Sequence, residues 1–206
     1  MNFLKKLFLL FFKPTQFYEA VSEEKSYIHI FSFYAIFAII IAVLVQIPWE
    51  FFQYADFMFQ LILSTGFIFS LIKVLFFPFV YAFLIYFIII RLGGKSNYLN
   101  TYKVAAYAGI IGLVYGLIFS FVVNNGAIND LIKASPSHNL TFAWATLPVY
   151  LIILAEYIQV FYSMITGLSI YQKIRKVPIL IVLIVLEILF YLMGYLANFF
   201  GFVNIF

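Results

Sequence analysis

The sequence predicts an all-α integral membrane protein, a polytopic bundle of about five transmembrane helices preceded by short interfacial helices. Of its 206 residues, 66% are hydrophobic and only 10% are charged, whereas soluble domains carry about 25% charged residues. The mean hydropathy is +1.10. A soluble fold of this length could not bury so much apolar surface, because small domains expose much of theirs. Lipid accepts that surface.

The N-terminal segment, residues 1–27, is predicted to lie at the membrane surface. Residues 2–13 combine lysines with an apolar run that is too short to cross a bilayer, which is typical of an interfacial amphipathic helix. Pro14 breaks this helix, and Thr15 is expected to cap a second short helix over residues 16–24. The rest of the chain, residues 28–206, is expected to form the five-helix transmembrane domain.

Five long apolar segments in this second part are each long enough to span a bilayer. Pro78 is expected to kink the second segment, and Pro178 opens the fifth. Residues 50–66 alternate polar and aromatic positions, so they form either a surface helix or an extension of the next span. The predicted spans cover residues 28–47, 67–90, 102–123, 144–168 and 178–200.

The charged residues set the orientation of these spans. Basic residues gather before the first span and in the loops after the second and fourth. The loops on the opposite side contain one basic residue, Lys133. The positive-inside rule therefore places the N-terminus in the cytoplasm and the C-terminus outside. We expect a multi-pass protein of a prokaryotic cell membrane. The residues expected to contact lipid headgroups are Lys5, Lys6, Lys13, Arg91, Lys95, Lys173, Arg175 and Lys176, and Lys103 is expected to do the same.

Three ionisable residues fall inside predicted spans: Lys73, Glu156 and Glu187. A charge at the centre of a span costs about 2.5–3.5 kcal/mol, so these side chains should face the bundle interior. They are either a proton or ion relay, or structural partners, with Lys73 and Glu156 paired across the bundle. Gln159 offers a further polar contact on the fourth span.

Small residues follow one face of the third span. Ala108, Gly112 and Gly116 recur every four residues, with Gly109 beside them. This spacing lets helix backbones approach closely, either within the chain or between two copies.

No motif points to catalysis, a metal or a cofactor. The sequence contains no cysteine, which excludes thiolate metal sites and cysteine nucleophiles. His29 and His138 have no acidic partners at ligand spacing. The net charge of +4 belongs to groups at the ends of apolar segments, so we expect no nucleic-acid partner.

Several short motifs resemble the Yip domain family, the Ypt/Rab-interacting membrane proteins and their prokaryotic relatives. Residues 92–108 contain a Gly-Gly turn, an aromatic residue and a threonine before a helix with a Tyr-Ala step, in which the matching residues are Gly93, Gly94, Tyr98 and Thr101. Lys13-Pro14-x-x-Phe17 and Gly167-Leu168-Ser169 match the helix before the first span and the turn after the fourth. The resemblance covers residues 10–200.

This resemblance implies a non-enzymatic protein that acts by membrane organisation or partner binding. The implied partners are membrane lipids, another protein or a second copy of the chain. The acidic Tyr-Gly-Pro-Trp segment linked to Rab binding is absent from residues 1–27, so a Rab-type GTPase is not an expected partner. The alternative function is a small transporter or channel that uses Lys73, Glu156 and Glu187.

Overall fold

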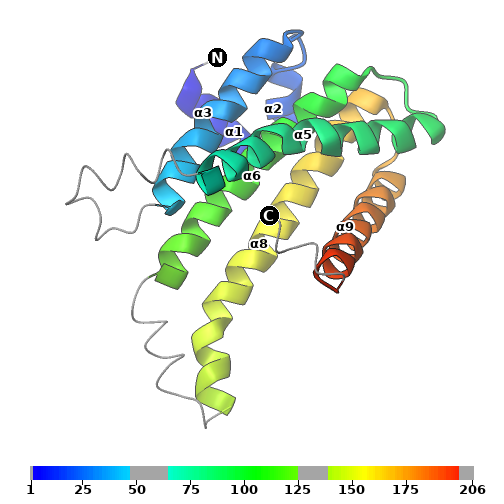
Figure 1. Ribbon diagram of the computed structural model, residues 1–206. Coiled ribbons are helices and arrows are strands. Elements are labelled where there is room, and N and C mark those ends of the chain that lie inside the picture. Colours follow the sequence, from blue (N-terminus) through cyan, green and yellow to red (C-terminus); the bar gives the residue numbers. More distant parts are fainter. Residues whose placement is uncertain (1, 47–64, 125–138, 200–206) are drawn as a thin grey trace.

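A computed structural model describes residues 2–46, 65–124 and 139–199 of the chain. These residues form seven α-helices, of which five are long and apolar enough to cross a membrane. The all-α class is therefore confirmed, and the number of candidate spans matches the predicted number (Figure 1). Most of the ambiguous segment 50–66 lies outside the described residues.

Two short helices open the chain, α1 (Phe3–Phe12) and α2 (Pro14–Ala20). Asn2 caps α1, and its side-chain oxygen accepts from the backbone N–H of Leu4 at 3.3 Å. The prediction for α2 was wrong at both ends, since the helix begins at Pro14 rather than after a Thr15 cap and ends at Ala20. Proline has no N–H to donate and its φ suits the first helical position, so Pro14 starts this helix as well as ending the previous one.

The membrane-spanning helices are α3 (Tyr27–Gln46), α5 (Thr65–Arg91), α6 (Tyr98–Asn124), α8 (Asn139–Gln172) and α9 (Lys176–Phe199). The predicted spans agree with these helices to within a few residues at most ends. α6 begins one turn before the predicted residue 102, because the side chain of Asn97 accepts from the backbone N–H of Asn100 at 3.1 Å. Hydropathy locates the apolar centre of a span, whereas a polar cap sets its first turn.

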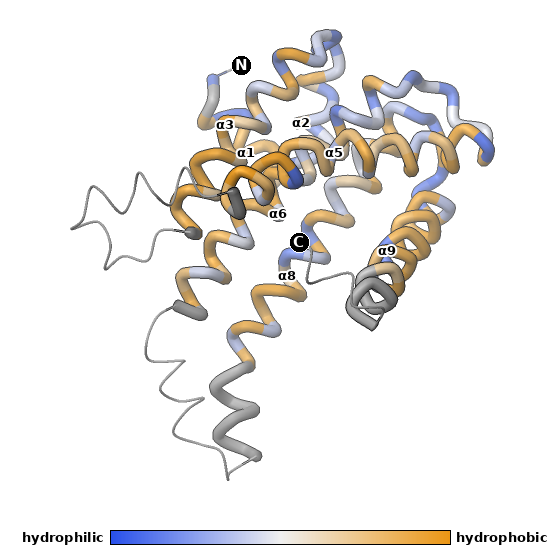
Figure 2. Tube along the Cα trace, in the orientation of Figure 1, coloured by the Kyte–Doolittle hydropathy of each residue, from blue (hydrophilic) through white to orange (hydrophobic). Residues whose placement is uncertain are grey.

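Helix α6 lies at the centre of the bundle. It packs against α3, α5 and α8, while α9 packs against α8 and α5 and α2 packs against α8. Tyr102, Tyr107 and Ile110 of α6 are fully buried. Large apolar side chains cover the outer faces of the spans, and the hydrophilic residues gather toward one end of the molecule (Figure 2). This distribution is what a lipid environment requires.

The turn between α5 and α6 ends one helix sharply. The N–H of Gly93 donates to the carbonyl of Ile90 at 3.1 Å, and the N–H of Gly94 donates to that of Ile89 at 2.9 Å, which is the Schellman pattern. Gly93 has φ +90°, a left-handed conformation that glycine adopts without a steric cost. Gly94 is needed for close packing, because an added Cβ would lie 2.7 Å from Cγ2 of Ile89 and 2.9 Å from Oε1 of Gln172.

Pro78 lies inside α5 and frees the carbonyl of Val74, four residues earlier. The hydroxyl of Tyr34 on α3 donates to this carbonyl at 2.9 Å. The Tyr34 ring also packs against α6 at Gly109, where an added Cβ would stand 3.1 Å from Cε2 of the ring. Tyr34 therefore supplies the hydrogen bond that Pro78 cannot give to Val74, and it joins α3, α5 and α6.

We predict that Tyr34→Phe lowers the free energy of unfolding by about 1–3 kcal/mol, because it leaves the Val74 carbonyl without a donor. In a Pro78→Ala background the N–H of residue 78 replaces the hydroxyl, and the cost of Tyr34→Phe should fall by about 1 kcal/mol or more. Unfolding in detergent measures both values. Tyr150→Phe, at an exposed tyrosine, is the matched control, and an equal cost of Tyr34→Phe in both backgrounds would contradict the assignment.

Candidate functional site

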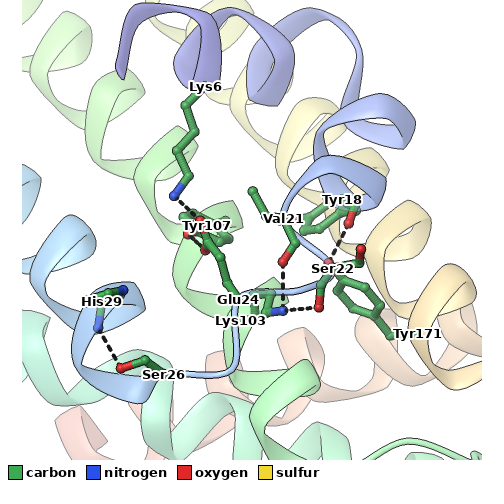
Figure 3. A network of polar contacts seen from close by, with 10 residues as sticks. All are labelled: Lys6, Tyr18, Val21, Ser22, Glu24, Ser26, His29, Lys103, Tyr107 and Tyr171. Atoms are coloured by element: carbon green, nitrogen blue, oxygen red, sulfur yellow. Dashed lines mark hydrogen bonds and ion pairs between the residues drawn. The ribbon is translucent and has the colours of Figure 1, made fainter. Parts of the chain in front are cut away.

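The N-terminal hairpin, α1 and α2, is held to the bundle by a polar cluster, here called the hairpin network (Figure 3). It comprises Lys6, Tyr18, Glu24, Lys103, Tyr107 and Tyr171 together with the carbonyls of Val21 and Ser22.

Lys103 joins the end of α2 to α6. Its ammonium donates to the carbonyls of Val21 at 2.9 Å and Ser22 at 3.1 Å, and the residue is fully buried. The expectation that Lys103 faces lipid headgroups was wrong. The last carbonyls of a helix carry partial negative charge, and here they give the buried ammonium its partners.

Glu24 accepts two hydrogen bonds in the same network. Nζ of Lys6 donates to Oε1 of Glu24 at 2.7 Å, and the hydroxyl of Tyr107 donates to the other carboxylate oxygen. The Lys6 ammonium also lies 4.6 Å from the ring centroid of Phe33 and 4.9 Å from that of Tyr107. Lys6, predicted as a headgroup contact, thus ties α1 to the segment after α2, and only 14% of its side chain is exposed.

Tyr18 fixes α2 against α8. Its hydroxyl lies 2.9 Å from the hydroxyl of Ser163, and its backbone carbonyl accepts from Tyr171 at 2.6 Å. Burial raises the pKa of the Tyr18 phenol above its ordinary value, so this group stays protonated at physiological pH. The prediction of a turn at Gly167 was wrong, because this residue lies inside α8. It makes the approach of Tyr18 possible, because an added Cβ would lie 2.8 Å from the Tyr18 ring and 2.7 Å from Val104.

Gln159 binds the end of α1. Its amide nitrogen donates to the carbonyl of Phe11 at 2.8 Å, and its amide oxygen accepts from the hydroxyl of Tyr115 at 2.6 Å. The structure therefore places this predicted intramembrane polar residue between α6, α8 and the N-terminal hairpin.

Gln172, at the end of α8, organises the turn before α6. Its amide oxygen accepts from the backbone N–H of Ser96 at 3.0 Å, and its amide nitrogen donates to Thr101 at 2.8 Å. Its carbonyl accepts from the N–H of Lys95 at 3.3 Å. Tyr98 meanwhile donates to the carbonyl of Phe79 at 2.9 Å. The motif residues Tyr98 and Thr101 therefore join the first turn of α6 to α5 and α8.

A cavity of about 940 Å³ lies between the spans, and Lys73, Glu156 and Glu187 all line it. The sequence placed these three residues on different helices, and the structure brings them to one site. Glu187 accepts from the hydroxyl of Tyr81 at 3.0 Å. The proposed pairing of Lys73 with Glu156 stays a prediction.

The small residues of α6 also line this cavity, including Ala108, Gly109, Gly112 and Gly116. An added Cβ at Gly112 would stand 3.3 Å from Oε1 of Glu156, and one at Gly116 would meet no atom of the described residues within 4 Å. Packing between two copies stays a prediction, whereas close packing against another helix of the chain is not seen at Gly116 among the described residues. Its missing side chain leaves space instead.

The sequence did not reveal the network residues Tyr18, Glu24, Tyr107 and Tyr171, nor the role of Gln172 at the α5–α6 turn. The one available signal was Lys103, a lysine within the first turns of an apolar helix, and it was assigned to the headgroups because its partner segment is distant in sequence.

We predict that Lys103→Met lowers the free energy of unfolding by about 2–3 kcal/mol, since the buried carbonyl of Val21 and the carbonyl of Ser22 lose a charged donor. Thermal unfolding in detergent measures the loss. Lys95→Met is the matched control, because Lys95 is exposed at the same end of the bundle and the variant should behave like the wild type. Equal stability of the two variants would show that Lys103 does not anchor the hairpin.

Comparison with known families supports the resemblance seen in the motifs. The model of the Yip1 domain matches residues 8–197. No curated protein and no solved structure is significantly similar to the chain. The match covers nearly the whole length, including the cavity, all five candidate spans and every residue of the hairpin network except Lys6. The chain belongs to the Yip1 domain family of multi-span membrane proteins, a family that is generally non-enzymatic.

Proposed function

We propose that this protein acts without catalysis by organising the lipid around it, through an N-terminal helix held at the membrane surface. The observation that carries the proposal is the exposed face of α1. Leu9 and Leu10 pack into the bundle, whereas Leu4, Phe8 and Phe12 are 71%, 53% and 70% exposed. These three residues recur every four positions, so they form one apolar stripe.

Basic residues accompany this apolar stripe. Lys5 and Lys13 are exposed, and the network that binds Lys6 fixes the helix against the bundle. An apolar face beside lysines is the pattern of a helix that lies in the interface of an anionic membrane. Because the hairpin network holds α1 in place, its stripe would enter the same leaflet in every copy.

The other exposed basic residues support one orientation. The α5–α6 turn and the end of α8 meet through Gln172, so Arg91 and Lys95 lie at the same end as Lys173, Arg175 and Lys176. In our proposal this end faces the cytoplasm, as the positive-inside rule requires, and the protein resides in a prokaryotic cell membrane. Anionic headgroups are then the partner of its basic surface.

The cavity favours a second function, that of a small transporter or channel. Lys73, Glu156 and Glu187 line one space among the spans, and ionisable groups at that depth often mark substrate or ion pathways. Flux into proteoliposomes that Glu156→Gln abolishes would support this second function, while wild-type protein that folds but carries no flux would remove it.

We predict that α1 inserts its apolar stripe into anionic membranes. Because the chain has no cysteine, Phe8→Cys gives a single site for an environment-sensitive fluorophore. In nanodiscs with anionic lipid, its emission should shift to the blue and be quenched by brominated acyl chains. Neutralising Lys5 and Lys13 to glutamine should reduce both effects in anionic lipid and leave them unchanged in zwitterionic lipid.

Arg91→Gln with Lys95→Gln is the matched control, because it removes the same charge from another loop. It should leave the emission at position 8 as in the wild type. Water-like emission in every lipid, or no response to the loss of Lys5 and Lys13, would refute the proposal.

A further inference from the structure

The cavity between the spans is lined by charged and aromatic side chains that have no part in the proposed lipid contact of α1. It measures about 940 Å³ and is lined by residues of α3, α5, α6, α8 and α9. Sites for small organic molecules commonly measure about 300–1,000 Å³, so this volume suits a molecule of that size.

The charged groups on its wall favour a cation. Among the described residues, its wall carries two carboxyl groups, those of Glu156 and Glu187, and one ammonium group, that of Lys73. Glu187 already accepts from Tyr81, but Glu156 makes no hydrogen bond or ion pair with any residue that the structure describes. A carboxylate within a membrane span is costly unless a partner meets it.

The rest of the wall is apolar and rich in aromatic rings. Phe77, Phe119, Tyr157 and Phe161 line the cavity, and aromatic faces attract organic cations. A metal ion would need more ligands, and the described part of the chain contains no group of three or more histidine or acidic side chains able to hold one. An organic cation with a hydrophobic body matches both the carboxylate and the rings.

Glycine keeps the carboxylate accessible. A side chain at Gly112 would begin 3.3 Å from Oε1 of Glu156, and Gly116 faces open space. Larger residues at these two positions of α6 would fill the cavity beside the acid.

We infer that the cavity is a binding site for a hydrophobic organic cation, with Glu156 as its counter-ion and the aromatic wall around its body. This inference does not depend on the lipid contact of α1.

Tetraphenylphosphonium is a suitable probe, and tetraphenylborate is an anion of nearly the same shape. In equilibrium dialysis of the full chain in nonionic detergent, corrected with protein-free micelles, the phosphonium should bind saturably to one site and the borate should not. Glu156→Gln should weaken phosphonium binding at least tenfold. Gly116→Leu, which keeps both carboxylates and fills the space, should do the same.

Glu23→Gln is the matched control, because it removes an exposed carboxylate outside the cavity and should leave binding at the wild-type level. If Glu156→Gln does not fold, phosphonium binding by Gly116→Leu alone tests the inference. The inference is overturned if wild-type protein binds no more phosphonium than the micelle blank, if the borate binds equally well, or if the folded variants bind as tightly as the wild type.

Discussion

Backbone carbonyls that lose their helical partner within or beside a membrane must find a donor in the protein, and this requirement shapes the whole molecule. Lys103 supplies the donor for the end of α2, Gln159 supplies it for Phe11 at the end of α1, and Tyr34 supplies it for Val74 beside the proline of α5. Each donor comes from a different helix than its acceptor. The same bonds that complete the backbone therefore fix how the helices are arranged.

The position of the N-terminal hairpin follows from these bonds. A ten-residue helix such as α1 is marginal on its own, and the pairing of Lys6 with Glu24 and the bond from Gln159 hold it to the bundle. Docking in this way buries Leu9 and Leu10 and leaves the opposite stripe for lipid. Among the spans, Gly112 and Gly116 of α6 leave room for the cavity that Lys73, Glu156 and Glu187 line.

Local patterns in the sequence were enough to predict the spans, the glycine turn at Gly93 and the family. Hydropathy and turn residues act over a few positions, and the structure follows them closely. The sites could not be predicted in this way, because they depend on contacts between residues far apart in sequence. Lys103 and Val21, for example, are 82 residues apart. A single sequence shows that a lysine interrupts an apolar helix, but not which carbonyls will lie opposite its ammonium. For the same reason Lys73, Glu156 and Glu187 were recognised as a possible relay or as partners, while the cavity that all three line was not foreseen.

The docking of the hairpin is tested most directly by a distance between it and the bundle. The cysteine-free chain accepts spin labels at Glu19 on α2 and Arg91 on α5, both of which are exposed. In lipid nanodiscs, pulsed electron paramagnetic resonance should give one narrow distance distribution for the otherwise wild-type protein and a broad one when Lys103→Met is added. A broad distribution in the wild-type background, or a narrow one that Lys103→Met leaves unchanged, would contradict the account.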